Sequence, residues 1–138
     1  MSDERAGPGA VLRVLVAEDT RIFRETVVAL FSLEDGIEVV AEVAAGTGIV
    51  AAALECRPDV ALVDIAMPGA DGLCAAAELA RRLPDCKVVV LTALGTPDNR
   101  RRAAAAGVCG FLLKGVPAAT LIDAVRSAAR PAGSRRPG

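Results

Sequence analysis

The sequence predicts an α/β fold with a doubly wound sheet of five parallel strands and five helices. Strand-like and helix-like segments alternate along the chain. The runs 60–63 and 88–91 are apolar on both faces, which is typical of strands in the middle of a parallel sheet. The segment 37–43 instead alternates and would place Glu38 and Glu42 on one side, so it is expected to form an edge strand.

Each predicted strand is followed by a predicted helix. The expected strands are 12–17, 37–43, 59–63, 87–91 and 110–113, and the expected helices are 21–33, 46–56, 71–83, 97–106 and 117–129. Gly36 and Gly107 would follow the first and fourth helices, Asp71 would cap the third, and Pro117 suits the first turn of the fifth. With the second strand at an edge, the strand order is 2-1-3-4-5, the flavodoxin-like arrangement, and the crevice lies between strands 1 and 3.

Length and composition indicate one small domain. The 138 residues are enough for a single core, which we expect over 11–130, with a disordered N-terminal arm at 1–10 and a linker-like tail at 131–138. The net charge of −1 gives no electrostatic reason to expect this chain to bind DNA or a membrane surface.

The lack of long apolar segments and the cysteine and histidine content indicate where the protein is located and which site chemistry is excluded. With no membrane-spanning run and no signal peptide in the sequence, the expected location is cytoplasmic. The four cysteines lack CxxC spacing and the chain has no histidine, which argues against zinc and redox motifs. All four are therefore expected to be small buried hydrophobic residues.

Four of the predicted strands end at residues suited to phosphoryl chemistry. Glu18 and Asp19 follow the first strand, Asp64 the third, Thr92 the fourth and Lys114 the fifth. The carboxyl ends of parallel strands meet at one edge of the sheet, so these side chains should share a crevice. Three ionised carboxylates in one place need a cation, and Mg²⁺ is the metal ion whose oxygen ligands fit best. Alone, the acidic pair would merely favour the start of a helix.

Each of the remaining groups has a chemical role available to it. Asp64 precedes a loop containing Pro68 and Gly69, and an exposed carboxylate can act as a nucleophile and form an acyl phosphate. Thr92 could donate its hydroxyl to a phosphoryl oxygen, and Lys114 could supply a positive point charge. Either residue alone is more often structural, so the joint placement is the specific feature.

These motifs resemble the receiver domain of bacterial two-component response regulators. The resemblance covers about residues 11–129 and rests on Glu18-Asp19, Asp64 with Met67-Pro68, Thr92-Ala93, and the segment 110–114 that ends in Lys114. The segment 105–114 is similar to the LuxR/NarL-type subgroup, whose receiver domains precede a helix-turn-helix domain.

The resemblance implies a site and a function. It implies Mg²⁺ bound by Asp19, Asp64 and the Ala66 carbonyl, with Glu18 supporting the ion. It also implies that a sensor histidine kinase phosphorylates Asp64, and that Thr92 and Lys114 bind the phosphoryl group. Phe111 would occupy an aromatic switch position together with Thr92.

The expected output is a change in dimerisation or in the activity of an output domain, in transcription regulation. A homodimer is expected on phosphorylation, and DNA would be bound only through a helix-turn-helix domain absent from this chain. The fourth helix, 97–106, offers mainly alanine methyls to the sheet, so it should be weakly anchored and able to move.

Two other functions share part of this pattern. A phosphohydrolase of the haloacid dehalogenase class would need a second aspartate two residues after Asp64, where this chain has Ala66, so a turnover enzyme is not expected. A receiver-fold interaction module that works without phosphorylation is the alternative, and the presence of Asp19, Asp64, Thr92 and Lys114 argues against it.

Overall fold

The computed structural model describes residues 10–69 and 71–130, and it confirms the predicted sheet. Five parallel strands lie in the order β2-β1-β3-β4-β5. Their bounds are β1 Leu12–Ala17, β2 Ile37–Val43, β3 Val60–Val63, β4 Lys87–Thr92 and β5 Gly110–Leu113. The central strand β3 is completely buried, as its apolar sequence predicts.

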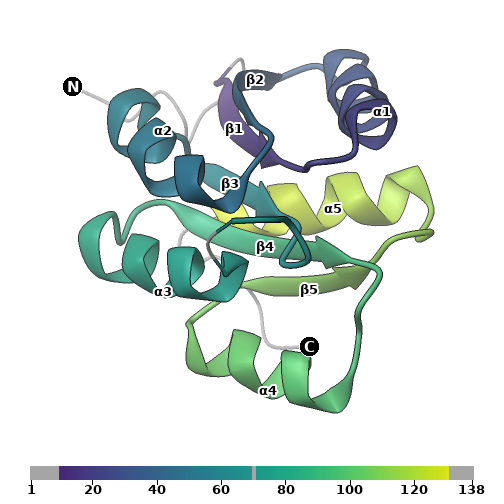
Figure 1. The fold of residues 1–138 in the computed structure, drawn as a ribbon. Coiled ribbons are helices and arrows are strands. Elements are labelled where there is room, and N and C mark those ends of the chain that lie inside the picture. Colours follow the sequence, from purple (N-terminus) through teal and green to yellow (C-terminus); the bar gives the residue numbers. More distant parts are fainter. Residues whose placement is uncertain (1–9, 70, 131–138) are drawn as a thin grey trace.

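Helices cover both faces of the sheet (Figure 1). Their bounds are α1 Arg21–Ser32, α2 Ile49–Cys56, α3 Gly72–Arg82, α4 Pro97–Ala105 and α5 Ala118–Ala129. Helices α1 and α5 pack on one face, over a core that includes Phe31, Leu62 and Val125. Helices α2 and α3 pack on the other, over a core that includes Leu15 and Leu79.

Four of the ten helix ends coincide with the predicted ends, and the other six differ by one to three residues. The segment predicted as a helix from residue 46 begins as a 3-10 helix, η2 (Gly46–Gly48), and α2 starts only at Ile49. Asp71 caps α3, as predicted, by accepting a hydrogen bond from the Leu73 N–H. Pro117 lies at the N-cap of α5, just before the first turn where the sequence placed it.

Strand β2 is an edge strand, as predicted, but its two glutamates do not share a side. The register between β1 and β2 shifts by one residue, so that Val14 pairs with Val39 and Leu15 with Ala41. Val40 is left over, and the alternation of side chains reverses after it. Glu42 therefore lies on the α1 side, where Arg24 forms an ion pair with it at 3.3 Å, whereas Glu38 points to the opposite side.

Helix α4 is weakly anchored, as predicted. The whole helix is described, and its one buried residue is Ala103. Two exposed arginines are among its other contacts: Arg102 forms an ion pair with the α3 cap Asp71, and the guanidinium of Arg100 lies 4.7 Å from the centre of the Phe111 ring. Polar contacts at the surface contribute less than core packing, so α4 is the helix best able to shift.

The prediction that all four cysteines are buried is wrong. Cys86 is buried, Cys56 is half-buried, and Cys74 and Cys109 are exposed. Cys74 falls between buried positions on α3 and points outward, because a helix turns by about 100° per residue. Cys109 precedes β5 at the end of the loop from α4.

The four thiols should therefore react with a thiol reagent at very different rates. In the native protein at pH 8, Cys74 and Cys109 will be labelled first because they are accessible. Cys86 will stay unlabelled because burial raises the pKa of its thiol to about 12, with a smaller contribution from Asp59, and the thiolate is the reactive form. Peptide mapping after timed labelling measures this order, and rapid native labelling of Cys86 would contradict it.

The predicted arm and tail, 1–10 and 131–138, lie almost entirely outside the described residues. Among the helices that the structure describes, none is both long and apolar enough to cross a membrane.

Candidate functional site

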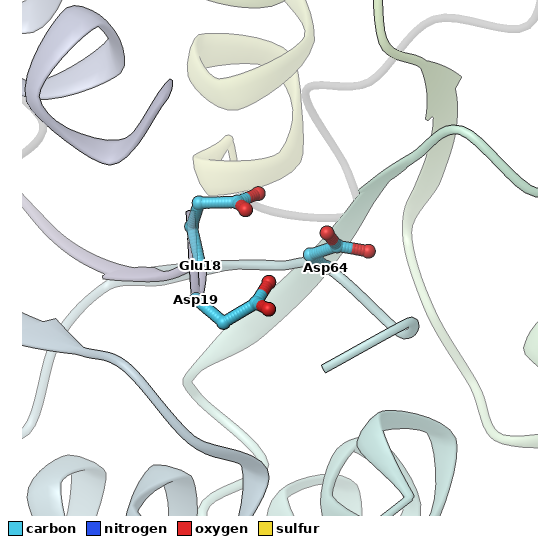
Figure 2. Close-up of side chains that lie close together, drawn as sticks. All are labelled: Glu18, Asp19 and Asp64. Carbon is cyan, nitrogen blue, oxygen red and sulfur yellow. The ribbon is translucent and has the colours of Figure 1, made fainter. Parts of the chain in front are cut away.

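Three carboxylates meet at the carboxyl edge of the sheet. Glu18 and Asp19 directly follow β1, and Asp64 directly follows β3, the neighbouring strand. One ligand oxygen from each lies within 4.8 Å of the others, and Figure 2 shows the three side chains gathered around one space. Glu18 and Asp64 are buried and Asp19 is exposed, so the cluster opens to solvent on the Asp19 side.

Lys114 reaches this cluster from the edge strand β5. It directly follows β5, which is separated from β3 by β4, so its side chain extends across the end of β4. The ammonium Nζ lies 2.9 Å from Glu18 Oε1 and 2.9 Å from Asp64 Oδ2. Burial lowers the pKa of Lys114, but the hydrogen bonds to Asp64 and Glu18 outweigh it, and the net effect is a raised pKa. The ammonium is therefore charged at neutral pH.

Glu18 is fixed by contacts on both its side chain and its backbone. Its Oε2 accepts a hydrogen bond from the Thr20 N–H at 2.9 Å, and its carbonyl oxygen accepts one from Arg24 Nη1 at 2.7 Å. Burial raises the pKa of Glu18, Lys114 and the Thr20 N–H oppose that rise, and the Asp64 charge adds to it. The net pKa of Glu18 is raised, and burial is the largest cause.

The loop after β3 holds Asp64 from the other side. Asp64 Oδ1 accepts a hydrogen bond from the Ala66 N–H at 2.9 Å, while Oδ2 contacts Lys114. Gly72, where α3 begins, lies so close to the loop that a Cβ there would be 2.9 Å from Ile65 Cα. Close backbone packing therefore limits how far this carboxylate can move.

Thr92 and Phe111 lie near this edge of the sheet. Thr92 ends β4 and is buried; its Oγ1 accepts a hydrogen bond from the Leu94 N–H at 3.1 Å, and its carbonyl accepts one from the Lys114 N–H at 2.9 Å. Phe111 lies on β5 beside Thr92's strand and is half-buried beneath Arg100.

Comparison with known proteins identifies the family. The sequence model described as "Response regulator receiver domain" matches residues 14–126. The chain belongs to the response regulator receiver family. It is 38% identical over 117 residues to the transcriptional regulatory protein DesR of Bacillus subtilis, a match that covers 85% of this chain and 58% of DesR. The chain thus spans little more than half the length of the curated relatives it matches.

Solved receiver structures have the same fold. The NarL signal receiver domain from Mycobacterium tuberculosis is 34% identical with a TM-score of 0.83, covering 87% of this chain and 97% of that one. A LuxR-family DNA-binding response regulator from Staphylococcus aureus is 26% identical with a TM-score of 0.82, covering 87% of this chain and 100% of that one. These likenesses agree with the LuxR/NarL-type subgroup that the sequence resembles.

The acidic cluster of this receiver domain has the composition of a site for a hard divalent cation. The three carboxylates and one ammonium leave a formal charge of −2 when all are ionised, and the available ligands are oxygen atoms. Mg²⁺ favours such ligands and retains several waters, which the open side at Asp19 allows. Ala66, whose carbonyl is the third Mg²⁺ ligand that the resemblance implies, lies in the adjacent loop, two residues after Asp64.

Two residues near the site are not among those that the sequence predicts for it. Arg24 contacts the Glu18 backbone, and the ring of Phe23 has its centre 4.5 Å from Lys114 Nζ. Both lie in the first turn of α1, immediately after the acidic pair, which is the one sequence signal that points to them. Phe23 is also one of only three aromatic residues in the chain.

Proposed function

We propose that this receiver domain accepts a phosphoryl group on Asp64 from a sensor histidine kinase, in the presence of Mg²⁺, and thereby switches dimerisation or an output domain in transcription regulation. The observation that supports this most is the position of Asp64. Its carboxylate lies between two other carboxylates and an ammonium, 2.9 Å from Lys114 Nζ. That is an arrangement suited to a nucleophile that attacks an anionic donor.

The transfer itself is a displacement at phosphorus. An Asp64 oxygen attacks the phosphorus atom and forms a P–O bond, while the bond from phosphorus to the donor breaks. With a phosphohistidine donor, the imidazole nitrogen leaves with the bonding electrons; with acetyl phosphate, acetate leaves. Lys114 binds a phosphoryl oxygen and stabilises its charge, and Thr92 donates its hydroxyl to another.

The cation would be bound by Asp19, Asp64 and the Ala66 carbonyl oxygen, with Glu18 supporting it. Mg²⁺ supplies charge neutralisation for the incoming phosphoryl group. The acidic cluster within 4.8 Å supports this assignment. Asp19 is the exposed member and would be the first ligand that the ion meets.

The switch would act through Thr92, Phe111 and α4. If Thr92 moves toward the new phosphoryl group, Phe111 can turn inward, and its contact with Arg100 changes. The single buried residue of α4, Ala103, offers little resistance to a shift of the helix. Phosphorylation would then stabilise a second arrangement of α4 and β5.

The proposed role in transcription regulation is supported by the relatives of this chain. DesR is named a transcriptional regulatory protein, and the match covers 58% of its length. DNA would be bound through a helix-turn-helix output domain, and a cytoplasmic location stays a prediction. The proposed role is that of a phosphoacceptor and not of a turnover enzyme.

Acetyl phosphate offers a direct test. The protein is incubated with acetyl phosphate and Mg²⁺, or with acetyl phosphate and EDTA, and its intact mass is measured. We expect one phosphate adduct with Mg²⁺ and none with EDTA, and light scattering on the same samples reports any dimer. If acetyl phosphate and phosphoramidate both fail with Mg²⁺, the receiver chemistry is contradicted and the phosphorylation-independent interaction module is favoured.

A further inference from the structure

We propose that Phe23 is a positioning residue for Lys114: its ring face holds the ammonium over the site when the carboxylates take up other partners. This inference rests on the proposed function, because it assigns Phe23 a part in phosphoryl transfer. It concerns a residue of α1 that the sequence motifs do not include.

The geometry places the ammonium against three partners. Lys114 Nζ lies 2.9 Å from Glu18 Oε1, 2.9 Å from Asp64 Oδ2, and 4.5 Å from the centre of the Phe23 ring. A cation within about 6 Å of a ring centroid is attracted to the negative face of the ring, more strongly where water is partly excluded. The Lys114 side chain is 22% exposed, so this contact is largely shielded from solvent.

The ring itself is held in place. Phe23 is half-buried and packs against the core beneath α1 and α5. The neighbouring Arg24 attaches the same turn of α1 to the Glu18 carbonyl at 2.7 Å and to Glu42 at 3.3 Å. The first turn of α1 therefore presents the ring at a fixed place beside the acidic cluster.

Lys114 needs such a support because its other two partners change during the reaction. A lysine side chain is flexible, with four methylene groups and a strongly hydrated head, and this one must span the end of β4. A divalent cation among the carboxylates repels the ammonium, and phosphorylation occupies one Asp64 oxygen. Neither event alters the electron density of the Phe23 ring, so the ring remains a partner throughout.

A packing role alone would not require an aromatic residue at this place. The chain has three phenylalanines and no tyrosine or tryptophan, and among the described residues Phe31 is the one aromatic side chain in the buried core. In the described part of the chain, two of the three rings lie under a cation, Phe23 under Lys114 and Phe111 under Arg100. Leucine would fill most of the volume of Phe23 but offers no negative face.

Two substitutions separate positioning from packing. Phe23→Leu keeps an apolar side chain and removes the ring, whereas Phe23→Tyr keeps the ring face and adds a hydroxyl. A packing role predicts that leucine is tolerated at least as well as tyrosine; positioning predicts the opposite order. With acetyl phosphate and Mg²⁺, we expect Phe23→Leu to lower the initial phosphorylation rate by roughly three- to tenfold, the size of a shielded cation–π contact, and Phe23→Tyr to stay near wild type.

Lysine NMR reports the contact without phosphorylation or metal. The chain has only two lysines, Lys87 and Lys114, so their ε-methylene signals can be assigned with a Lys87→Arg variant. The ring current of Phe23 should shift the Lys114 signal upfield of Lys87, and Phe23→Leu should remove that shift. Ile22→Ala, at a neighbouring side chain that is 76% exposed, is the matched control and should change neither signal nor rate.

These experiments distinguish failure of the Phe23 positioning role from failure of the proposed phosphorylation of Asp64. If the wild-type protein takes up no phosphate, the function fails first. If the wild type is phosphorylated and Phe23→Leu reacts at the same rate, or reacts faster than Phe23→Tyr, the positioning role is contradicted. An unshifted Lys114 signal in the wild type contradicts it as well, whatever the rates. Should Phe23→Leu not fold, the wild-type NMR signal and the rate of Phe23→Tyr still decide.

Discussion

The Asp64→Asn variant will take up no phosphate from acetyl phosphate and Mg²⁺, whereas the wild-type protein will take up one. An amide oxygen is far less nucleophilic than a carboxylate oxygen and cannot form an acyl phosphate. The fold should persist, because the asparagine Oδ1 can still accept the hydrogen bond that the Ala66 N–H donates at 2.9 Å. Intact mass after incubation measures the loss.

Asp71→Asn is the matched control for this prediction. It makes the same substitution on the loop that joins β3 to α3, and asparagine is as good an N-cap as aspartate, so α3 should keep its capping bond to Leu73. We expect this variant to be phosphorylated at nearly the wild-type rate. Equal loss in both variants would mean that loop disturbance, and not the identity of the acceptor, explains the first result.

The Lys114→Met variant should show the second large effect, on both rate and stability. Its initial phosphorylation rate should fall roughly 100-fold, as is typical when one electrostatic contact to the transition state is lost. Without Mg²⁺ the free energy of unfolding should fall by about 3 kcal/mol, because two buried carboxylates lose the ammonium that they share. Mg²⁺ should reduce this difference in unfolding free energy between the variant and the wild type, because it binds the folded state.

The other lysine gives the control here. Lys87 Nζ contacts the Pro84 carbonyl at 3.0 Å, away from the acidic cluster, so Lys87→Met should leave the rate unchanged and stability within about 0.5 kcal/mol, as is usual for surface substitutions. Urea unfolding with and without Mg²⁺ gives the stability values. A Lys114→Met protein as stable as the wild type without Mg²⁺ would show that the ammonium does not balance the carboxylates.

The sheet was predictable because its signals are local and agree with one another. The apolar run of β3 and the alternation of β2 each indicate burial directly, and the strand order follows from them. The side on which Glu42 lies was not predictable, because the extra residue Val40 arises from pairing between β1 and β2. Nothing within 37–43 itself marks that irregularity.

Burial of single residues on helices was less predictable than the helices themselves. Cys74 was expected in the core, yet its neighbours Leu73 and Ala75 are the ones that pack. On an alanine-rich helix, many rotations give nearly the same apolar stripe. The choice among them is made by the β-sheet surface, which a local pattern does not describe.

The meeting of the site residues was predicted from strand ends, and the structure places Glu18, Asp19, Asp64 and Lys114 together. Their roles stay predictions. The contact between Phe23 and Lys114 joins α1 to the end of β5, and no spacing in the sequence relates two residues so far apart. Such a contact follows from the topology, which brings α1 and α5 to the same face.

Chemical identification of the phosphorylated residue tests the central claim most directly. The wild-type protein is phosphorylated with acetyl phosphate and Mg²⁺ and then reduced with borohydride, which converts an aspartyl phosphate to homoserine, and peptide mass mapping locates the product. Our account predicts homoserine at position 64 and at no other aspartate. Homoserine at Asp19 or another position, or phosphate bound without any reducible acyl phosphate, would contradict it.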